Sequence, residues 1–335
     1  MPETARYRAI ARTLMREIET GKLATGSLLP RRVDLSRRFG VNRITVDRSI
    51  ALLAARGLVV SHRGGGTRIT AQRPALNLAV ITSRAEVESL EAWQRHLPDG
   101  GTCQWTHLRL EELQSRSDRA HLSRFDGLLW YLPYSAAYEW IRDIRGKQPQ
   151  LVLNREMSDV SYVSTDHRTP IRDLTSARLR AHPAAIPVFL RTRPDPLPGV
   201  VGLRQEGFVD ACREAGRFYE VLDLPEEFAA KQALLEERLR PTAGRPVLLV
   251  SSSVFHTGAV ATWVCRHHWT WGKELLYSDF DDRFPAHVWG VRVTTFIQDY
   301  AQLAEVGTEK LIAMIQGKEK DVRLLLPPVR VDGDT

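Results

Sequence analysis

The sequence predicts an α/β protein with two unlike parts, a small basic N-terminal domain and a larger remainder built around parallel β-sheets. Residues 1–73 carry 15 Lys and Arg against 5 Asp and Glu, a net charge of +10. The other residues carry 32 basic and 35 acidic side chains, a net charge of −3. In that remainder, short apolar runs alternate with helical stretches, the pattern of parallel strands covered by helices. Basic charge confined to one small domain indicates a segment that binds nucleic acid.

The first seventy residues predict three helices followed by a β-hairpin. Apolar residues at helical spacing mark a first helix that ends at Gly21, and a second helix begins near Pro30 and ends before Gly40. Asn42 is a good N-cap for a third helix. The stretch LVVSHRGGGTRI (58–69) then predicts two short strands joined by a glycine turn. This order of elements predicts a winged helix–turn–helix domain over residues 1–70.

The N-terminal segment resembles the DNA-binding domain of GntR-type repressors. The resemblance rests on the order and spacing of Tyr7, Ile10, Ile18, Gly21, Leu29, Pro30, Leu35, Phe39, Gly40, Val41, Arg43, Thr45, Val46, Leu53, Gly57, Leu58, Val59, Gly64, Gly66 and Thr67. It implies that the third helix enters the major groove of a double-stranded DNA operator, with the glycine wing in the minor groove. The candidate DNA contacts are then Arg31, Arg32, Asn42, Arg43, Thr45, Asp47, Arg48, Arg63, Gly65 and Gly66.

Two positions depart from the GntR-type pattern. Val33 and Asp47 stand where the family usually has basic residues, and Arg32 and Arg48 are plausible substitutes. Three roles are open for Asp47. It accepts a hydrogen bond from a cytosine amino group, it orients Arg43 or Arg48, or it points away from the bases and favours the helix through the macrodipole.

Residues 71–75 predict a polar linker, and residues 76–335 predict two α/β lobes. Apolar strand-like runs recur at LNLAVIT (76–82), GLLWYL (127–132), QLVLN (150–154), AIPVFL (185–190), PVLLVS (246–251) and ELLYS (274–278). A segment of this length with so many buried strands is more typical of two lobes than of one.

The order of short motifs over residues 76–331 resembles the effector domain of LacI/GalR-type repressors, which has a periplasmic-binding-protein-like fold. The motifs are AVITS (79–83), FDGLL (125–129), PQLVLNR (149–155), Val163 with Asp166, RQEGF (204–208), FDD (280–282) and TTFIQDY (294–300). The resemblance implies an N-lobe of about 76–164 and 293–322 and a C-lobe of about 165–292 and 323–335. Such a body would bind an effector and form a homodimer. A GntR-type head on this body resembles the arabinose-repressor type of regulator.

The family resemblance also assigns candidate effector contacts, which would meet in the cleft between the lobes. They are Ser83, Asn154, Arg204, Asp281, Gln298 and Tyr300, and we add Ser252 as a seventh candidate. An arginine fork offers two donors to sugar hydroxyls or to a carboxylate, and Asp281 would accept from hydroxyls. Ser252 and Ser253 depart from the family, which often has Asn-Asp there, so the sequence does not assign a plain pentose or hexose.

Other site types find little support in the sequence. Cys265, His267 and His268 are close in sequence, but neighbouring histidines on a helix point apart, so we expect no metal site. We expect no cofactor and no catalytic residues, because no Schiff-base lysine setting and no G-x-S-x-G motif occurs. No apolar run approaches the length of a membrane span, and three scattered cysteines suit a reducing compartment. We therefore expect a cytoplasmic protein.

These observations favour a ligand-responsive transcriptional regulator, more specifically a repressor. Its partners would be a palindromic operator, a sugar or related polar metabolite, and a second copy of the chain. Two alternatives stay open. One is an effector-independent DNA-binding protein with a degenerate cleft. The departure from the family at Ser252 and Ser253 is consistent with it. The other is a DNA-binding head fused to an enzyme-like body.

Overall fold

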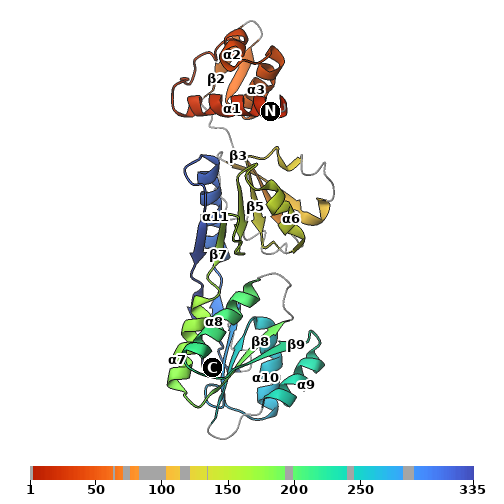
Figure 1. Ribbon diagram of the computed structural model, residues 1–335, viewed down its shortest axis with the longest axis vertical. Coiled ribbons are helices and arrows are strands. Elements are labelled where there is room, and N and C mark those ends of the chain that lie inside the picture. Colours follow the sequence, from red (N-terminus) through yellow and green to blue (C-terminus); the bar gives the residue numbers. More distant parts are fainter. Residues whose placement is uncertain are drawn as a thin grey trace. The chain divides into compact units, whose positions relative to one another are not determined.

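A computed structural model of the chain describes residues 3–62, 65–70, 76–82, 103–113, 121–133, 135–192, 199–239, 245–281 and 290–335. The predicted linker, residues 71–75, lies outside this part. The chain divides into two compact units near Leu78, which we call the head and the body. This boundary lies within strand β3 (Leu76–Thr82). We assign β3 and β4 (Cys103–Arg109) to the body, because both belong to a six-stranded sheet of the body (Figure 1). The structure thus has the predicted mixed α/β architecture.

The head consists of three helices and a two-stranded antiparallel hairpin, in the predicted order. Its elements are α1 (Glu3–Glu19), α2 (Arg32–Phe39), α3 (Arg43–Ala55), β1 (Val59–His62) and β2 (Gly66–Ile69). Gly40 ends α2 in the left-handed conformation, with φ of 61°. One apolar core joins the helices to the hairpin and includes Leu14, Leu35, Val46, Leu53 and Ile69, all essentially buried.

The first lobe of the body is built on a six-stranded sheet with strand order β13-β7-β6-β5-β3-β4. Trp130 and Ile141 lie at the centre of its largest apolar cluster, and both side chains are fully buried. The predicted apolar runs at 76–82, 127–132 and 150–154 all form strands of this sheet. The elements of the lobe are β3 (Leu76–Thr82), β4 (Cys103–Arg109), η1 (Leu110–Glu112), β5 (Gly127–Tyr131), α6 (Ser135–Ile144), β6 (Gln150–Leu153), β7 (Tyr162–Thr165), α11 (Tyr300–Ile315) and β13 (Arg323–Leu326).

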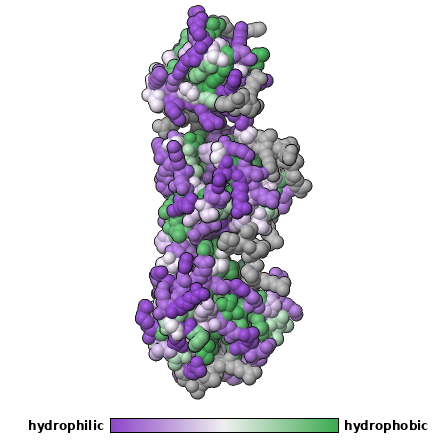
Figure 2. Space-filling model, in the orientation of Figure 1, coloured by the Kyte–Doolittle hydropathy of each residue, from purple (hydrophilic) through white to green (hydrophobic). Residues whose placement is uncertain are grey.

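The second lobe has a six-stranded sheet of its own, with strand order β14-β12-β11-β10-β8-β9. Apolar clusters cover both of its faces, one around Trp263 and one around Phe208. Its elements are α7 (Thr169–Ala181), β8 (Ile186–Thr192), α8 (Val200–Glu214), β9 (Glu220–Leu224), α9 (Phe228–Arg238), β10 (Val247–Ser251), η2 (Val254–His256), α10 (Thr257–Arg266), β11 (Leu275–Phe280), β12 (Thr294–Ile297) and β14 (Val329–Val331). Figure 2 shows hydrophilic residues over much of the visible face of the molecule.

The chain passes between the two sheets three times, and two of these crossovers differ from the prediction. The first lies after Thr165, as expected. The second was expected near residue 292, but β12 pairs in parallel with β11, so residues 294–297 belong to the second lobe. The third was expected near 322, but β13 pairs with β7 and stays in the first lobe. Pro327 and Pro328 then mark that crossover, because proline lacks the N–H that would continue the ladder.

Candidate DNA-binding and ligand-binding sites

The third helix of the head begins with the predicted N-cap. Asn42 Oδ1 accepts hydrogen bonds from the backbone N–H and from the hydroxyl of Thr45, both at 2.8 Å. Thr45 is buried, so its hydroxyl supports the start of the helix from inside the head. Of the two predicted contacts, Asn42 is exposed and Thr45 is not.

Asp47 is held between two arginines. Arg32 Nε donates to Asp47 Oδ1 at 2.5 Å, so the pair joins α2 to α3. Arg43 Nε lies 3.8 Å from Asp47 Oδ2, one helical turn away. Of the three roles that the sequence left open, this geometry matches the second, in which Asp47 orients Arg43. The ion pair with Arg32 of α2 was not predicted.

The other candidate DNA contacts lie at the surface. The Arg43 side chain is 76% exposed, and Arg31 and Arg48 are exposed as well. In the wing, Gly65 and Gly66 are exposed, and Gly66 has φ of 80°, a conformation that favours glycine. Arg63 lies outside the described residues. Two large apolar side chains beside these charges, Val33 and Ile44, are 64% and 61% exposed.

A half-buried ion pair fixes the first two helices of the head to each other. Nη1 and Nη2 of Arg38 both donate to the carboxylate of Glu17, which is 8% exposed. The Arg38 guanidinium lowers the pKa of Glu17 to about 2. Arg38 also stacks over the Phe39 ring, with its central carbon 4.8 Å from the ring centroid. One of the many basic residues of the head is therefore structural.

In the body, two strands are each followed by a polar residue whose backbone has a positive φ. Asn154 follows β6 with φ of 58°, and Asp281 follows β11 with φ of 72°. Left-handed conformations are uncommon for residues other than glycine and often occur at functional sites. Asn154 is 1% exposed, while the Asp281 side chain is 23% exposed.

Arg204 is the buried centre of a polar network that contains most of the predicted effector contacts. It lies on α8 and is 3% exposed. Its Nη1 donates to the Ser252 carbonyl oxygen at 2.5 Å, and its Nη2 donates to Asp281 Oδ2 at 3.2 Å. The guanidinium carbon lies 3.6 Å from the centroid of the Phe280 ring. Burial lowers the pKa of Arg204, and Asp281 opposes this effect.

Gln298 and Tyr300 extend the network to the second crossover. Gln298 Nε2 lies 2.7 Å from both carboxylate oxygens of Asp281, and it lies 2.8 Å from the hydroxyl of Tyr300. Tyr300 begins α11 of the first lobe, so the network joins residues of both lobes. The hydroxyl of Ser252 is buried and makes no hydrogen bond within the described part of the chain. The remaining predicted contact, Ser83, lies outside that part.

His167 belongs to the same network and was not predicted from the sequence. It lies in the first crossover, is fully buried, and contacts Arg204 and Asn154. A single histidine between Asp166 and Arg168 has no spacing that marks it as a site residue. We therefore define the crossover network as Asn154, His167, Arg204, Asp281, Gln298 and Tyr300.

Cys265 and His267, two of the three residues that are close in sequence, have surroundings unlike a metal site. His267 Nε2 lies 2.7 Å from Glu236 Oε2, and its ring stacks on Trp269 at 4.9 Å. Cys265 is exposed. Over the described ranges, no group of three or more His, Cys, Asp and Glu side chains is placed to hold a metal ion. In the same ranges, no helix is long and apolar enough to cross a membrane.

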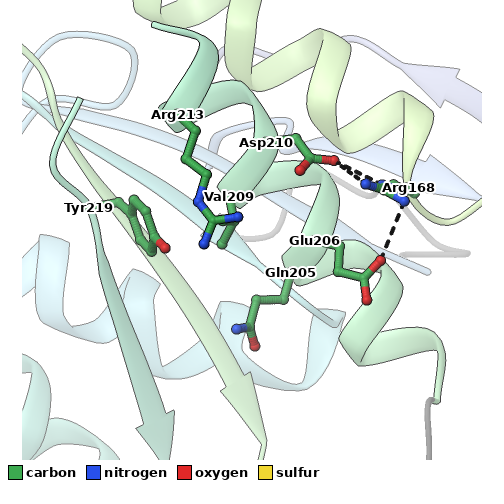
Figure 3. A pocket seen from close by; sticks show the side chains of 7 residues that line it. All are labelled: Arg168, Gln205, Glu206, Val209, Asp210, Arg213 and Tyr219. Carbon is green, nitrogen blue, oxygen red and sulfur yellow. Dashed lines mark hydrogen bonds and ion pairs between the residues drawn. The ribbon is translucent and has the colours of Figure 1, made fainter. Parts of the chain in front are cut away.

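A hollow of about 420 Å³ lies against another side of α8 (Figure 3). Arg168 closes one side through ion pairs with Asp210 and Glu206, at 2.6 and 3.6 Å. Arg213 and Tyr219 lie on the other side. Its lining includes no residue of the crossover network. Within the RQEGF motif, Arg204 therefore belongs to the network, whereas Gln205 and Glu206 line the hollow.

Comparison with known proteins agrees with the division of the chain into head and body. Residues 6–69 match the family model of bacterial regulatory proteins of the gntR family. The head is a GntR-type DNA-binding domain. The HTH-type transcriptional regulator GgaR of Escherichia coli (strain K12) is 39% identical over 66 residues, which are 20% of this chain and 27% of that protein. The chain thus matches only about a quarter of that relative's length.

The body has the fold of LacI-type effector domains. A LacI-family regulatory protein from Chloroflexus aggregans matches with a TM-score of 0.63 and 17% identity, over 76% of this chain and 96% of that one. The lac repressor dimer, solved with operator and the anti-inducer ONPF, matches with a TM-score of 0.61 and 18% identity. That match covers 79% of this chain and 95% of the repressor. At 17–18% identity, these matches show a shared fold and nothing further.

Proposed function

We propose that this protein is a ligand-responsive transcriptional repressor. In this proposal the head binds a palindromic DNA operator, and the body binds a sugar or a related polar metabolite. Two copies of the chain act together as a homodimer held mainly by the body, in the cytoplasm and without a catalytic reaction or a cofactor. The observation that carries the proposal is the pairing of a GntR-type head with a LacI-type body that contains a buried polar network.

The surface of the head supports DNA binding. Exposed Arg31, Arg43 and Arg48 can neutralise phosphates or contact bases, and Arg43 is the first residue of α3. Asp47 holds Arg43 and Arg32, which limits their freedom before DNA arrives. A two-fold homodimer presents two such heads, and a palindromic operator matches that symmetry.

The crossover network supports ligand control. Its members lie just after β6 and β11, in α8 and α11, and in two crossovers, so a ligand that bonds to them would contact both lobes. A ligand changes an equilibrium between two arrangements only through its different affinity for them. Effector binding at this network would then change how the two heads of a dimer meet their half-sites.

A thermal-shift screen of the full-length chain tests the ligand part of this proposal. The probes are pentoses, hexoses, sugar acids and sugar phosphates, each added singly. A ligand at about 100 times its Kd should add roughly 2.7 kcal/mol to the free energy of unfolding. The expected result is a stabilising class that loses its effect in Arg204→Ala. If every probe leaves the midpoint unchanged, the proposed sugar-like effector class is wrong.

The second candidate function is an effector-independent DNA-binding protein. The observation in its favour is that the side chains of the crossover network bond to one another. Under this alternative, Arg204→Ala would reduce stability only, and no metabolite would change the affinity for DNA. Measuring operator affinity with and without each probe separates the two functions.

A further inference from the structure

One buried histidine connects residues of the two lobes within the crossover network. His167 follows β7 of the first lobe and precedes α7 of the second. On one side, Arg204 Nε and Nη2 lie 3.3 and 3.2 Å from His167 Nδ1. On the other side, His167 Nε2 lies 3.3 Å from Asn154 Oδ1. The ring also packs against Phe280, with centroids 5.4 Å apart.

The partners of His167 determine its protonation state. A guanidinium has only N–H donors, so His167 Nδ1 must accept and carries no proton. The neutral ring then holds its proton on Nε2 and donates it to Asn154 Oδ1. Burial lowers the pKa of His167 well below its ordinary value, and the charges of Arg204 and Arg155 lower it further. Geometry and environment agree on a neutral Nε2–H imidazole.

The crossover that carries His167 is itself closely fixed. Asp166 Oδ1 accepts the backbone N–H groups of Arg168 and Thr169, at 3.0 and 2.9 Å. Gly207 of α8 approaches so closely that a Cβ there would lie 2.2 Å from the Arg168 carbonyl oxygen. The histidine therefore has little freedom to move away from Arg204.

We propose that His167 is the positioning residue of the body's ligand site, fixing the Arg204 guanidinium of one lobe to Asn154 of the other. The remaining hydrogen bonds of Arg204 go to Ser252 and Asp281, which are both in the second lobe. Among the described residues, His167 connects this arginine to Asn154 of the first lobe through one side chain, whereas the path through Asp281 reaches Tyr300 only by way of Gln298. The proposal relies on the proposed function only where it assigns Arg204 to the ligand.

This arrangement also limits what Arg204 offers a ligand. Its bonds to His167, Asp281 and Ser252 engage Nε–H, both N–H groups of Nη2 and one of Nη1. Within the described residues, the second N–H group of Nη1 has no hydrogen-bond acceptor and could donate to a ligand. In this geometry the arginine would point one donor at a hydroxyl, rather than a two-donor fork at a carboxylate.

Three substitutions of His167 separate its two hydrogen bonds. His167→Asn keeps an acceptor near the place of Nδ1 and is too short to reach Asn154. His167→Gln places a donor near Nε2 and loses the acceptor at Nδ1. His167→Leu fills the space and keeps neither bond. A residue that only filled space would give three variants with similar effects on Arg204.

Nuclear magnetic resonance of the full-length chain without ligand or DNA gives the readout. The His167 ring should show an Nε2–H tautomer that does not titrate between pH 8 and 5.5. The Arg204 Nε–H, assigned by its loss in Arg204→Lys, should exchange slowly with solvent. We expect its exchange to become at least about tenfold faster in His167→Gln and His167→Leu, which corresponds to about 1.4 kcal/mol, and to stay slow in His167→Asn.

Several results would overturn the proposal. They are an Nδ1–H tautomer, a ring that titrates near pH 6.5, or exchange at Arg204 that is the same in all variants. If the leucine variant does not fold, the wild-type tautomer and the Asn–Gln contrast still decide. Because no ligand enters these measurements, their outcome is independent of the effector screen.

Discussion

The candidate sites of the head and of the body use the same residue type in opposite surroundings. Arg43 in the head has a side chain that is 76% exposed, whereas Arg204 in the body is 3% exposed. Phosphates of a DNA duplex approach from solvent, so arginines that bind them must lie at the surface. Small polar ligands are bound by fixed, converging donors and acceptors. Burial therefore separates the two kinds of site more clearly than residue type does.

The difference has an energetic consequence. Exposed arginines far apart act almost independently, so their substitutions should add. Residues of the crossover network share hydrogen bonds, so removing one leaves others buried without a partner. Substitutions in the crossover network should therefore lower the free energy of unfolding more, and add less well, than substitutions of the exposed arginines of the head.

Arg204→Ala should have the largest effect on ligand binding. Loss of a buried, charged donor should weaken binding by about 2–4 kcal/mol, while affinity for DNA changes little. Calorimetric titration of whichever probe stabilises the wild type measures the effect. Arg213→Ala on the same helix is the control, because Arg213 is exposed and lines the separate hollow. A full response to the probe in Arg204→Ala would remove this residue from the site.

Glu17→Gln tests the exception in the head, where a carboxylate is buried and its arginine partner is 40% exposed. Loss of the charged hydrogen bonds to Arg38 should lower the free energy of unfolding of the head by about 1.5–3 kcal/mol at pH 7. The pKa of Glu17 is about 2 in the folded chain, against 4.5 as the ordinary value. Its contribution is thus present above pH 4.5 and is lost as the pH falls towards 2.

Hydrogen exchange of the α1 amides as a function of pH follows this change in the head. The wild type should lose protection between pH 4.5 and 2, and the variant should lose less over the same interval. Equal pH profiles for the two proteins would mean that the pair contributes little.

Gly207→Ala should destabilise the body by about 1–3 kcal/mol, since the new Cβ would meet backbone atoms of the first crossover. Gly202→Ala is a matched control on the same helix, because nothing lies within 4 Å of its Cβ position. There the change should stabilise by roughly 0.5–1 kcal/mol, as glycine is a poor helix former. Denaturant unfolding of both variants provides the measurement. Equal shifts of the same sign would contradict the close packing of α8 on the crossover.

Asp47→Arg should have a smaller effect on stability, because exposed ion pairs contribute about 0–1 kcal/mol. It removes the carboxylate that holds Arg32 and Arg43 and adds a positive charge. We expect tighter binding to all DNA with a weaker preference between sequences, measured by binding-site selection. Selection of the same site with unchanged stringency would show that Asp47 does not influence recognition.

Local sequence patterns predicted most of the helices and strands, whereas the contacts within the candidate sites depend on residues far apart in the sequence. Residues such as Asn42 and the apolar runs predicted helices and strands, because capping and burial act within a few residues. The crossovers at 298–299 and 327–328 were misplaced, since strand pairing across the sheet decides which lobe β12 and β13 join. His167 was missed because its role depends on Arg204 and Asn154, which are brought together only by folding. The Arg32–Asp47 pair was missed for the same reason.

In the proposed function, the exposed basic head reads DNA as part of a symmetric dimer. Binding-site selection from random duplexes with the full-length chain, followed by titration of the selected duplex over a range of salt, tests it most directly. We predict an inverted repeat whose affinity falls steeply with salt and whose preference over random DNA drops by about 1–3 kcal/mol in Arg43→Ala. Failure to enrich any sequence, together with affinity that is flat between low and physiological salt, would contradict the claim.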